Sequence, residues 1–223
     1  MKYVIMVGDG MADYPVERLG GRTPLTAART PNMDWMADHG EIGLVRTIPL
    51  GFTPGSEIAN LSIFGYDPAR YYTGRGPLEA ASLQVGLTDV DIAFRCNLVT
   101  LRFQGDEIVM EDFSAGHISN EEAREIISDL NKEMGTKEIQ FHAGVSYRHL
   151  MVLRNGAARF ADLEKLKLTP PHDIIGKEIS PFLPKTEAPV LTLTKESHRL
   201  LGNHPVNQAR KAKGLPPANS IWL

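Results

Sequence analysis

The chain has 223 residues, of which 42% are hydrophobic and 23% are charged, so it can bury a substantial core and is not disordered by composition. Its formal net charge of −3 gives no electrostatic reason to expect nucleic acid as a partner. The single cysteine, Cys96, rules out an internal disulfide and fits a reducing compartment. No apolar run reaches the roughly 18 residues of a membrane span, and the apolar N-terminal run is too short for a signal peptide. We therefore expect a cytoplasmic protein with no membrane partner.

The first 77 residues predict alternating strands and helices. Residues 2–7 are a short, β-branched apolar run before glycine, which is typical of a parallel strand buried on both faces. Two Thr-Pro pairs predict helices over residues 23–28 and from residue 31, the second ending at Gly40. A second strand is expected over 42–47, followed by a helix at Ser56. This order predicts a parallel α/β sheet with a site at the carboxyl ends of its strands.

The middle of the chain predicts a different, α+β organisation. Two strands joined by a turn at Gly105-Asp106 are expected between residues 91 and 113, and a second strand pair over 139–153. Between them, Ser119 with a glutamate three residues later predicts the start of a helix that runs to about residue 134. We interpret residues 78–184 as an insertion, after which 185–223 rejoin the first domain through a helix near 194–201. Four methionines are expected in the core: Met6, Met33, Met36 and Met151.

Asp9 and Ser56 are the strongest candidates for chemistry. Asp9 follows the first predicted strand between two glycines, where a carboxylate suits a divalent metal but can equally form a turn. Ser56 follows a Pro-Gly turn at the start of a helix, where it can attack a phosphoryl group or cap the helix. A serine nucleophile needs a metal or a base to stabilise its alkoxide. Because both residues end successive strand-like segments, the pair favours a joint function.

Three arginines form a second group. Arg75 lies between two glycines, whereas Arg95 and Arg148 lie in otherwise apolar strand-like segments. Bidentate contact with phosphate or carboxylate would explain them, and the alternative is an internal salt bridge, for example between Arg95 and Asp91. Three such arginines suggest a small ligand with several negative charges. His117, in a glycine-containing turn before a helix, is either a ligand-facing acid or base or a turn residue.

Ten short motifs, in order along the chain, resemble those of one protein family. They are GDGMAD (8–13), TPLTAA (23–28), TPNMD (30–34), PGS (54–56), LSIFGYDP (61–68), YTGRGPLEA (72–80), AFRCNL (93–98), YRH (147–149), PVN (205–207) and PANSIWL (217–223). Together they resemble the archaeal type of cofactor-independent phosphoglycerate mutase, in the alkaline phosphatase superfamily. The resemblance spans the whole chain. It implies an α/β fold with a partial, alkaline-phosphatase-like parallel sheet core formed by 1–77 and 185–223, and an inserted α+β cap domain at 78–184.

The resemblance also implies an activity, the interconversion of 2-phosphoglycerate and 3-phosphoglycerate. Ser56 would be the nucleophile and carry the phosphoryl group as phosphoserine. Asp9 and Ser56 would be ligands of a two-metal site holding Mn²⁺, Mg²⁺ or Zn²⁺, with no organic cofactor. The inserted domain would close over the substrate and exclude water, with these contacts: Arg75, Asp91, Arg95, His117 and Arg148.

One departure from the family pattern limits these expectations. Members of the family continue well beyond residue 223, and their later part carries most of the metal ligands. We therefore expect a truncated chain that binds metal weakly and catalyses poorly. The alternatives are a metal-dependent phosphatase, a phosphonate-processing or homoserine-kinase-like relative, and a catalytically inactive fragment.

Overall fold

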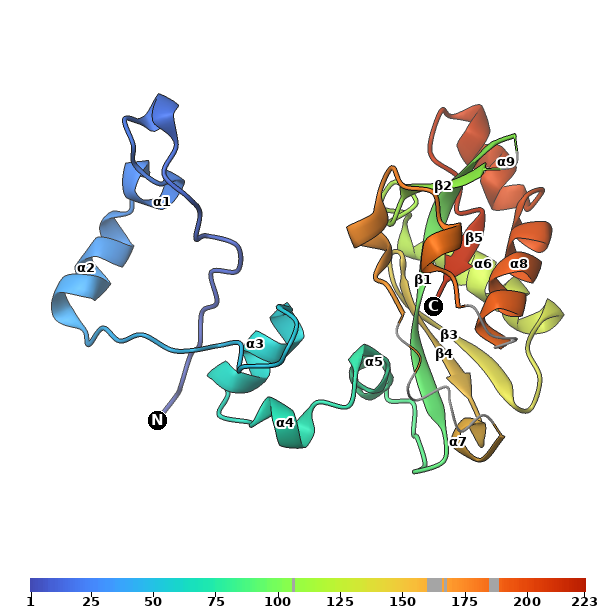
Figure 1. Cartoon of the computed structure of the whole chain (residues 1–223), viewed down its shortest axis with the longest axis horizontal. Coiled ribbons are helices and arrows are strands. Elements are labelled where there is room, and N and C mark those ends of the chain that lie inside the picture. The colour runs from blue at the N-terminus through green and yellow to red at the C-terminus, as the bar shows by residue number, and fades with distance from the viewer. Residues whose placement is uncertain (106, 160–165, 167, 185–188) are drawn as a thin grey trace. The chain divides into compact units, whose positions relative to one another are not determined.

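The computed structural model describes all residues of the chain except 106, 160–165, 167 and 185–188 (Figure 1). The contacts between residues divide the chain into two compact units, Met1–Tyr72 and Thr73–Leu223, which we call unit 1 and unit 2. Among the described residues, no helix is long and apolar enough to cross a membrane.

Unit 1 consists of short helices joined by irregular segments. Its elements are η1 (Glu17–Leu19), α1 (Pro24–Ala27), α2 (Pro31–His39), α3 (Ser56–Ile63) and α4 (Pro68–Tyr71). The predicted helix starts are confirmed, because proline opens both α1 and α2. Thr23 caps α1 by accepting a hydrogen bond from the backbone N–H of Thr26, and α2 ends immediately before Gly40.

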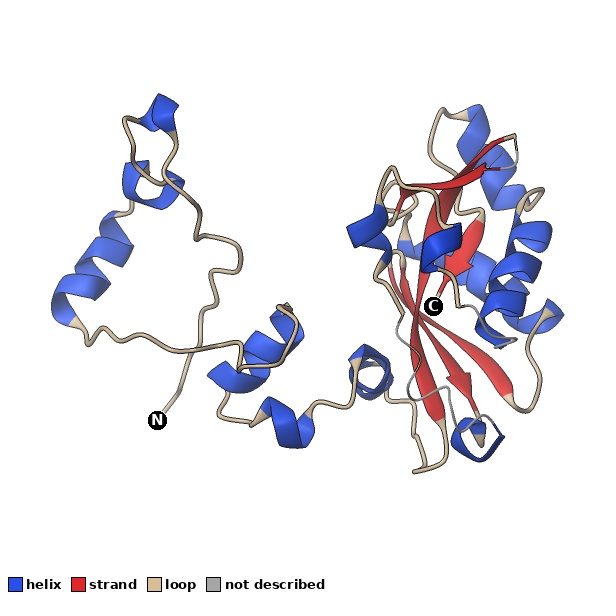
Figure 2. Cartoon of the chain, viewed as in Figure 1, coloured by secondary structure: helices blue, strands red, loops and turns tan. Residues whose placement is uncertain are grey.

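The strands predicted over 2–7 and 42–47 are wrong. Both segments lie outside any strand, and unit 1, which is described throughout, contains none (Figure 2). Their apolar side chains are exposed, as Val4 at 83% and Leu44 at 104% show. A parallel strand is stable only where neighbouring strands pair with its backbone and other elements cover both faces. Unit 1 offers no such neighbours, so the expected parallel sheet is not formed.

Unit 2 is a mixed α/β unit built on an antiparallel sheet. Its strands are β1 (Ile92–Gln104), β2 (Glu107–Asp112), β3 (Ile139–Val145), β4 (Arg148–Leu153) and β5 (Ser220–Trp222). Within the described ranges, the strand order is β2-β1-β4-β3, and β5 pairs with β1. The long strand β1 pairs with β4 over its first half and with β2 over its last residues.

Helices cover both faces of this sheet. They are α5 (Arg75–Ser82), α6 (Asn120–Glu133), α7 (Gly156–Arg159), α8 (Pro189–Leu201) and α9 (Pro205–Ala212), with the short turns η3 (Pro171–Ile174) and η4 (Ser180–Phe182). Figure 1 shows α6 and α8 on one side of the sheet and α5 on the other. Because side chains alternate along a strand, Phe94 and Cys96 of β1 pack in the main core with α6 and α8. Ala93 packs in a smaller cluster with Ala80 of α5.

Several local predictions for unit 2 are confirmed. The two strands of the 91–113 segment form an antiparallel hairpin with Gly105 at φ +60°, although Asp106 lies outside the described residues. Ser119 and Glu122 form a complete capping box at the start of α6. The second strand pair is β3 with β4, and the helix predicted near 194–201 is α8.

The C-terminal segment packs within unit 2. Strand β5 pairs with β1, and the Asn219 side chain accepts from the backbone N–H of Leu101 and donates to its carbonyl, both at 2.8 Å. The side chain of Asn207, on α9, likewise donates to the carbonyl of Ala218 and accepts from its backbone N–H. This division of the chain differs from the predicted grouping of 185–223 with 1–77. The predicted domain assignment stays a prediction.

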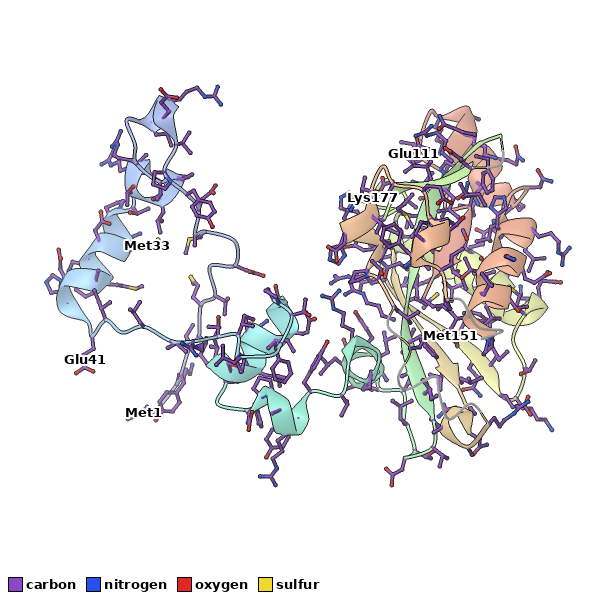
Figure 3. The ribbon with its side chains drawn as sticks, in the orientation of Figure 1. Met1, Met33, Glu41, Glu111, Met151 and Lys177 are labelled. Carbon is purple, nitrogen blue, oxygen red and sulfur yellow. The ribbon has the colours of Figure 1, made fainter. Side chains whose placement is uncertain are left out.

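The methionine predictions divide between the units. Met151 is fully buried in the main core of unit 2. In unit 1, Met6, Met33 and Met36 are exposed, so their predicted core positions are wrong. Figure 3 labels Met33 on α2 and Met151 on β4. The difference has the same cause as the missing strands, because unit 1 lacks a sheet against which these side chains could pack.

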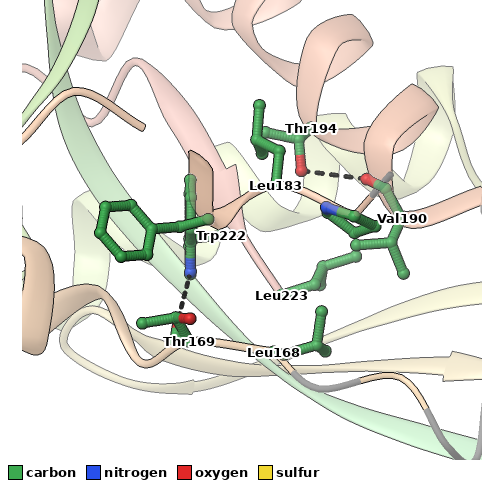
Figure 4. Close-up of a pocket in the computed structure, with 9 residues that line it drawn as sticks. Leu168, Thr169, Leu183, Val190, Thr194, Trp222 and Leu223 are labelled. Atoms are coloured by element: carbon green, nitrogen blue, oxygen red, sulfur yellow. Dashed lines mark hydrogen bonds between the residues drawn. The ribbon is translucent and has the colours of Figure 1, made fainter. Parts of the chain in front are cut away.

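A small apolar pocket lies beside the end of β5 (Figure 4). Its wall includes Trp222, whose indole Nε1 donates a 2.8 Å hydrogen bond to the carbonyl of Thr169. The rest of the lining is Leu168, Phe182, Leu183, Pro184, Val190, Thr194 and Leu223. Since none of the candidate site residues lines this pocket, the functional groups have to be sought elsewhere.

Candidate functional site

A serine–aspartate pair lies in unit 1. Ser56 is the first residue of α3, and its Oγ donates a 2.8 Å hydrogen bond to Oδ2 of Asp9, 47 residues earlier. Gly55 is the N-cap residue of this helix, so the alternative that Ser56 caps it is wrong. The two residues singled out from the sequence therefore meet, although the strands expected to carry them are absent from unit 1.

The backbone around the pair explains its geometry. Gly10 follows Asp9 with φ +75°, a left-handed conformation that glycine adopts without steric cost. Ser56 lies at the start of an eight-residue helix, where unpaired N–H groups and the helix dipole favour an anion. Both side chains are exposed. The pair thus presents a hydroxyl, hydrogen-bonded to a carboxylate, where a phosphoryl group would be stabilised.

The three predicted arginines gather in unit 2. Arg75 is the first residue of α5, Arg95 lies on β1, and Arg148 lies on β4. Burial lowers the pKa of the Arg95 guanidinium, and the positive charges of Arg75 and Arg148 lower it further, against the opposing effect of Glu79. These charge effects indicate that Arg75 and Arg148 each lie within electrostatic range of Arg95. We call Arg75, Arg95 and Arg148 the arginine cluster.

Arg95 is only partly satisfied within the protein. Its Nε lies 3.5 Å from Oε1 of Glu79, an ion pair without a hydrogen bond. Among the described residues, this buried N–H has no hydrogen-bond acceptor. A buried donor without a hydrogen-bond acceptor, near two other cations, fits a site that an anionic ligand completes.

Asp91 lies in a different environment from the arginine cluster. Its side chain is only 4% exposed and accepts hydrogen bonds from the backbone N–H groups of Thr88 and Asn155 and from Nη1 of Arg154. Burial raises the pKa of this carboxyl, but the hydrogen bonds outweigh that effect and lower the pKa to about 2. These contacts favour a structural role. The salt bridge considered for Arg95 with Asp91 is absent, since Asp91 pairs with Arg154.

His117 is exposed, and its ring lies among aromatic side chains. The imidazole centroid is 5.9 Å from the ring of Tyr147 and 6.4 Å from that of Phe113, both edge-on. The guanidinium carbon of Arg148 is 5.8 Å from the Tyr147 ring centroid, within range of a cation–π interaction. Tyr147 therefore links His117 to the arginine cluster. Sequence reasoning missed this tyrosine, although it directly precedes Arg148 in the YRH motif.

The structure therefore assembles two groups of predicted site residues. Asp9 and Ser56 meet in unit 1, while the arginine cluster and His117 lie in unit 2. Among the described residues, no three His, Cys, Asp or Glu side chains are placed to hold a metal ion. The individual roles predicted for Asp9, Ser56, Asp91, His117 and the arginines stay predictions.

Comparison with known proteins relates the chain to one family. A sequence model for 2,3-bisphosphoglycerate-independent phosphoglycerate mutase matches residues 37–207. A probable enzyme of that name from Geobacter sulfurreducens is 53% identical over 225 residues, which cover 100% of this chain and 55% of that protein. The enzyme of that name from Methanosarcina barkeri is 51% identical, with 100% of this chain and 54% of that protein covered. The chain thus spans about half the length of these curated relatives.

One solved structure is also similar to this chain over nearly its whole length. The structure of PH0037 protein from Pyrococcus horikoshii is similar to this chain with a TM-score of 0.61 and 30% sequence identity, and the match covers 96% of this chain and 48% of that one. The sequence model matches well over half of the chain, and it agrees with the resemblance carried by the ordered motifs. The chain therefore belongs to the family of 2,3-bisphosphoglycerate-independent phosphoglycerate mutases.

Proposed function

We propose that this chain takes part in the interconversion of 2-phosphoglycerate and 3-phosphoglycerate through a phosphoserine formed on Ser56. The observation that carries the proposal is the 2.8 Å hydrogen bond from Ser56 Oγ to Asp9 Oδ2 at the start of α3. Asp9 orients the Ser56 hydroxyl by accepting a hydrogen bond from it. The helix start then favours the negative charge of the phosphoryl group that the serine would accept.

The same pair fits a divalent metal ion as part of a ligand set. A carboxylate oxygen and a hydroxyl oxygen are hard ligands of the kind that Mg²⁺ and Mn²⁺ prefer and that Zn²⁺ also accepts. We propose Asp9 and Ser56 as two ligands of the family's metal site, to which other ligands must be added. When bound, such ions lower the pKa of the hydroxyl and neutralise charge on the transferring group. A cytoplasmic location belongs to the same proposal, and so does an alkaline-phosphatase-like core, which would need parts of the family's longer chain because unit 1 contains no strand.

The arginine cluster supplies the second part of the proposed chemistry. Phosphoglycerate carries a phosphate and a carboxylate, both of which suit the planar fork of a guanidinium. Arg95 has a buried N–H without an acceptor among the described residues, so an anion there would satisfy it. We propose that Arg75, Arg95 and Arg148 bind the substrate anion and that His117 contacts the same ligand from beside Tyr147. For Asp91 the contacts favour support of the fold over contact with the substrate.

A second candidate function is phosphate-ester hydrolysis, as in the metal-dependent phosphatases. The exposure of Ser56 favours it, because water that reaches a phosphoserine hydrolyses it instead of allowing return of the group. Phosphonate-processing and homoserine-kinase-like chemistry would use the same serine with another acceptor. The products formed therefore decide between these functions.

The first experiment tests the serine. The chain is incubated with Mn²⁺ and with 3-phosphoglycerate that is radiolabelled in its phosphate group. The amounts of 2-phosphoglycerate, free phosphate and labelled protein are each measured. We expect label on Ser56 and formation of 2-phosphoglycerate, both abolished by Ser56→Ala. The matched control is Ser62→Ala, on the same helix. Free phosphate without isomerisation would favour the phosphatase, and neither product nor label would contradict the proposal for this chain and favour a non-catalytic role.

The second experiment tests the arginine cluster by the affinity for 3-phosphoglycerate, measured by calorimetry. Arg95→Gln should weaken binding about tenfold or more, since a charge-assisted hydrogen bond contributes about 1.5–3 kcal/mol. Arg199→Gln is the matched control, because Arg199 is exposed and pairs with Glu196 on α8. Equal losses in both variants would show a general charge effect and contradict a specific site.

A further inference from the structure

The turn between β2 and α6 has an unusual backbone. Ala115, Gly116 and His117 have φ values of +48°, +64° and +50°, so three successive residues are left-handed. Two of them are not glycine, and Ala115 is fully buried. Non-glycine residues seldom adopt this conformation, and runs of them persist only where the surroundings enforce it. Contacts around the turn must therefore enforce its conformation.

Three side chains hold the turn, and one of them, Ser114, accepts a 3.2 Å hydrogen bond at its Oγ from the backbone N–H of His117. The carboxylate of Asp112 accepts hydrogen bonds from the N–H and Oγ of Ser114 and from the N–H of Gly116, at 2.7 to 2.8 Å. From α9, the buried Arg210 donates from Nη2 to the carbonyl of Ala115 at 2.6 Å. Asp112 is local to the turn, whereas Arg210 reaches it from 95 residues away in sequence.

The guanidinium of Arg210 is itself fixed by its other contacts. Its Nη1 donates to Oε2 of Glu122 at 2.6 Å, and its Nε donates to the carbonyl of Pro216 at 2.9 Å. Arg210 is only 3% exposed. A planar fork with three different acceptors can take only one orientation, so it constrains the carbonyl of Ala115 and the backbone that follows.

This turn carries His117, whose ring lies 5.9 Å from that of Tyr147. Tyr147 in turn contacts Arg148, and it interacts electrostatically with Arg95. We propose that Arg210 is a positioning residue whose fork holds the left-handed turn so that the His117 imidazole stays beside Tyr147, at the edge of the arginine cluster. That the positioned imidazole serves a phosphoglycerate site rests on the proposed function.

The first test measures the position of His117 without any ligand. In the full chain, NMR should show a cross-peak between the ring protons of His117 and Tyr147. Arg210→Lys keeps the charge but loses the fork, so it should abolish the cross-peak or displace the His117 signals. Asn207→Ala is the matched control, because this buried residue lies on the same helix and does not contact the turn. An unchanged cross-peak in Arg210→Lys would overturn the proposal.

A milder variant serves if Arg210→Lys does not fold. Glu122→Gln removes the charge that pairs with Arg210, while glutamine at this position still completes the capping box with Ser119. It should weaken the same cross-peak while α6 stays formed by circular dichroism. A cross-peak of full intensity in this variant, with the Arg210 side-chain signals displaced, would also overturn the proposal.

The second test measures affinity for 3-phosphoglycerate in the same variants. Arg210→Lys and His117→Ala should each weaken binding about tenfold, and the double variant should be no weaker than His117→Ala alone. Additive losses would show that Arg210 acts by another route. If the wild-type chain does not bind 3-phosphoglycerate but the cross-peak behaves as expected, the positioning role holds and the proposed function fails.

Discussion

Replacing Asp91 by asparagine tests whether this carboxylate supports the fold. In the folded chain, burial opposes ionisation of Asp91, but its hydrogen bonds with Thr88, Asn155 and Arg154 lower its pKa from 3.8 to about 2. With about 1.4 kcal/mol for each tenfold change in proton affinity, this difference corresponds to about 2 kcal/mol of stability. The Asp91 side chain is only 4% exposed, but its partner Arg154 is 26% exposed, so solvent screening makes about 2 kcal/mol an upper value. Asp91→Asn should therefore lower the free energy of unfolding by up to about 2 kcal/mol near neutral pH.

The predicted difference in stability between wild type and Asp91→Asn depends on pH. A carboxyl whose pKa is lower in the folded state stabilises the protein above its unfolded pKa, and the stabilisation is lost as the pH falls through the folded pKa. The difference between wild type and Asp91→Asn should thus be constant above about pH 4 and should shrink toward zero near pH 2. At that pH, the protonated aspartate and the asparagine are both uncharged.

The measurement uses urea unfolding of unit 2. Of the two tryptophans, Trp222 is buried in unit 2 and Trp35 is exposed in unit 1, so Trp222 fluorescence in a Trp35→Phe background reports on the correct unit. The matched control is Asp89→Asn, an exposed carboxylate two residues away. A difference below about 0.5 kcal/mol at neutral pH, or one that does not change with pH, would refute the reasoning.

Three further outcomes follow from buried groups in unit 2. Gly76→Ala should lower the free energy of unfolding in urea by about 1–3 kcal/mol, because a Cβ there would overlap the backbone carbonyl of Ala93. Gly86→Ala is the control, because open space surrounds Gly86. Equal effects of the two substitutions would contradict the overlap. Native Cys96 should not react with Ellman's reagent, because burial raises the pKa of its thiol, and rapid reaction before unfolding would contradict this burial. Burial lowers the pKa of His149 from 6.5 to about 4, so the free energy of unfolding should fall by about 3 kcal/mol as the pH drops from 6.5 to about 4. His149→Gln should flatten this part of the pH profile, and an unchanged slope would rule out His149 as its source.

The elements that could be predicted from the sequence are those whose signals are local. The capping box of α6 depends on two residues three positions apart, and the β1–β2 hairpin depends on one turn. The strand predicted at 2–7 depends on partners elsewhere, and an apolar run cannot show whether they are present. The same limit explains the exposed Met6 and the buried Met151, which look alike in sequence.

The candidate site shows the same contrast between local and distant signals. Arg95 and Arg148 could be singled out because a cation in an apolar strand is unusual, and Arg75 because it lies between two glycines. The partners could not be predicted, since Arg95 pairs with Glu79 on α5 and not with Asp91, which lies four residues earlier, just before β1 begins. The contact of Arg210 with the turn that carries His117 could not be predicted, because the three acceptors of Arg210 come from separate parts of the sequence.

The two groups of candidate residues differ in how firmly the protein holds them. Arg95 and Arg148 project from paired strands of a packed sheet, so their backbones are fixed by the hydrogen-bonded register. The Ser56–Asp9 pair is exposed, and a single hydrogen bond between exposed groups contributes only about 1 kcal/mol. One such bond does not by itself fix the geometry of the pair. Precise phosphoryl transfer needs a supporting shell around its reacting groups. The function proposed for Ser56 therefore requires further groups that fix this pair, whereas the strands that carry Arg95 and Arg148 already hold those arginines in place.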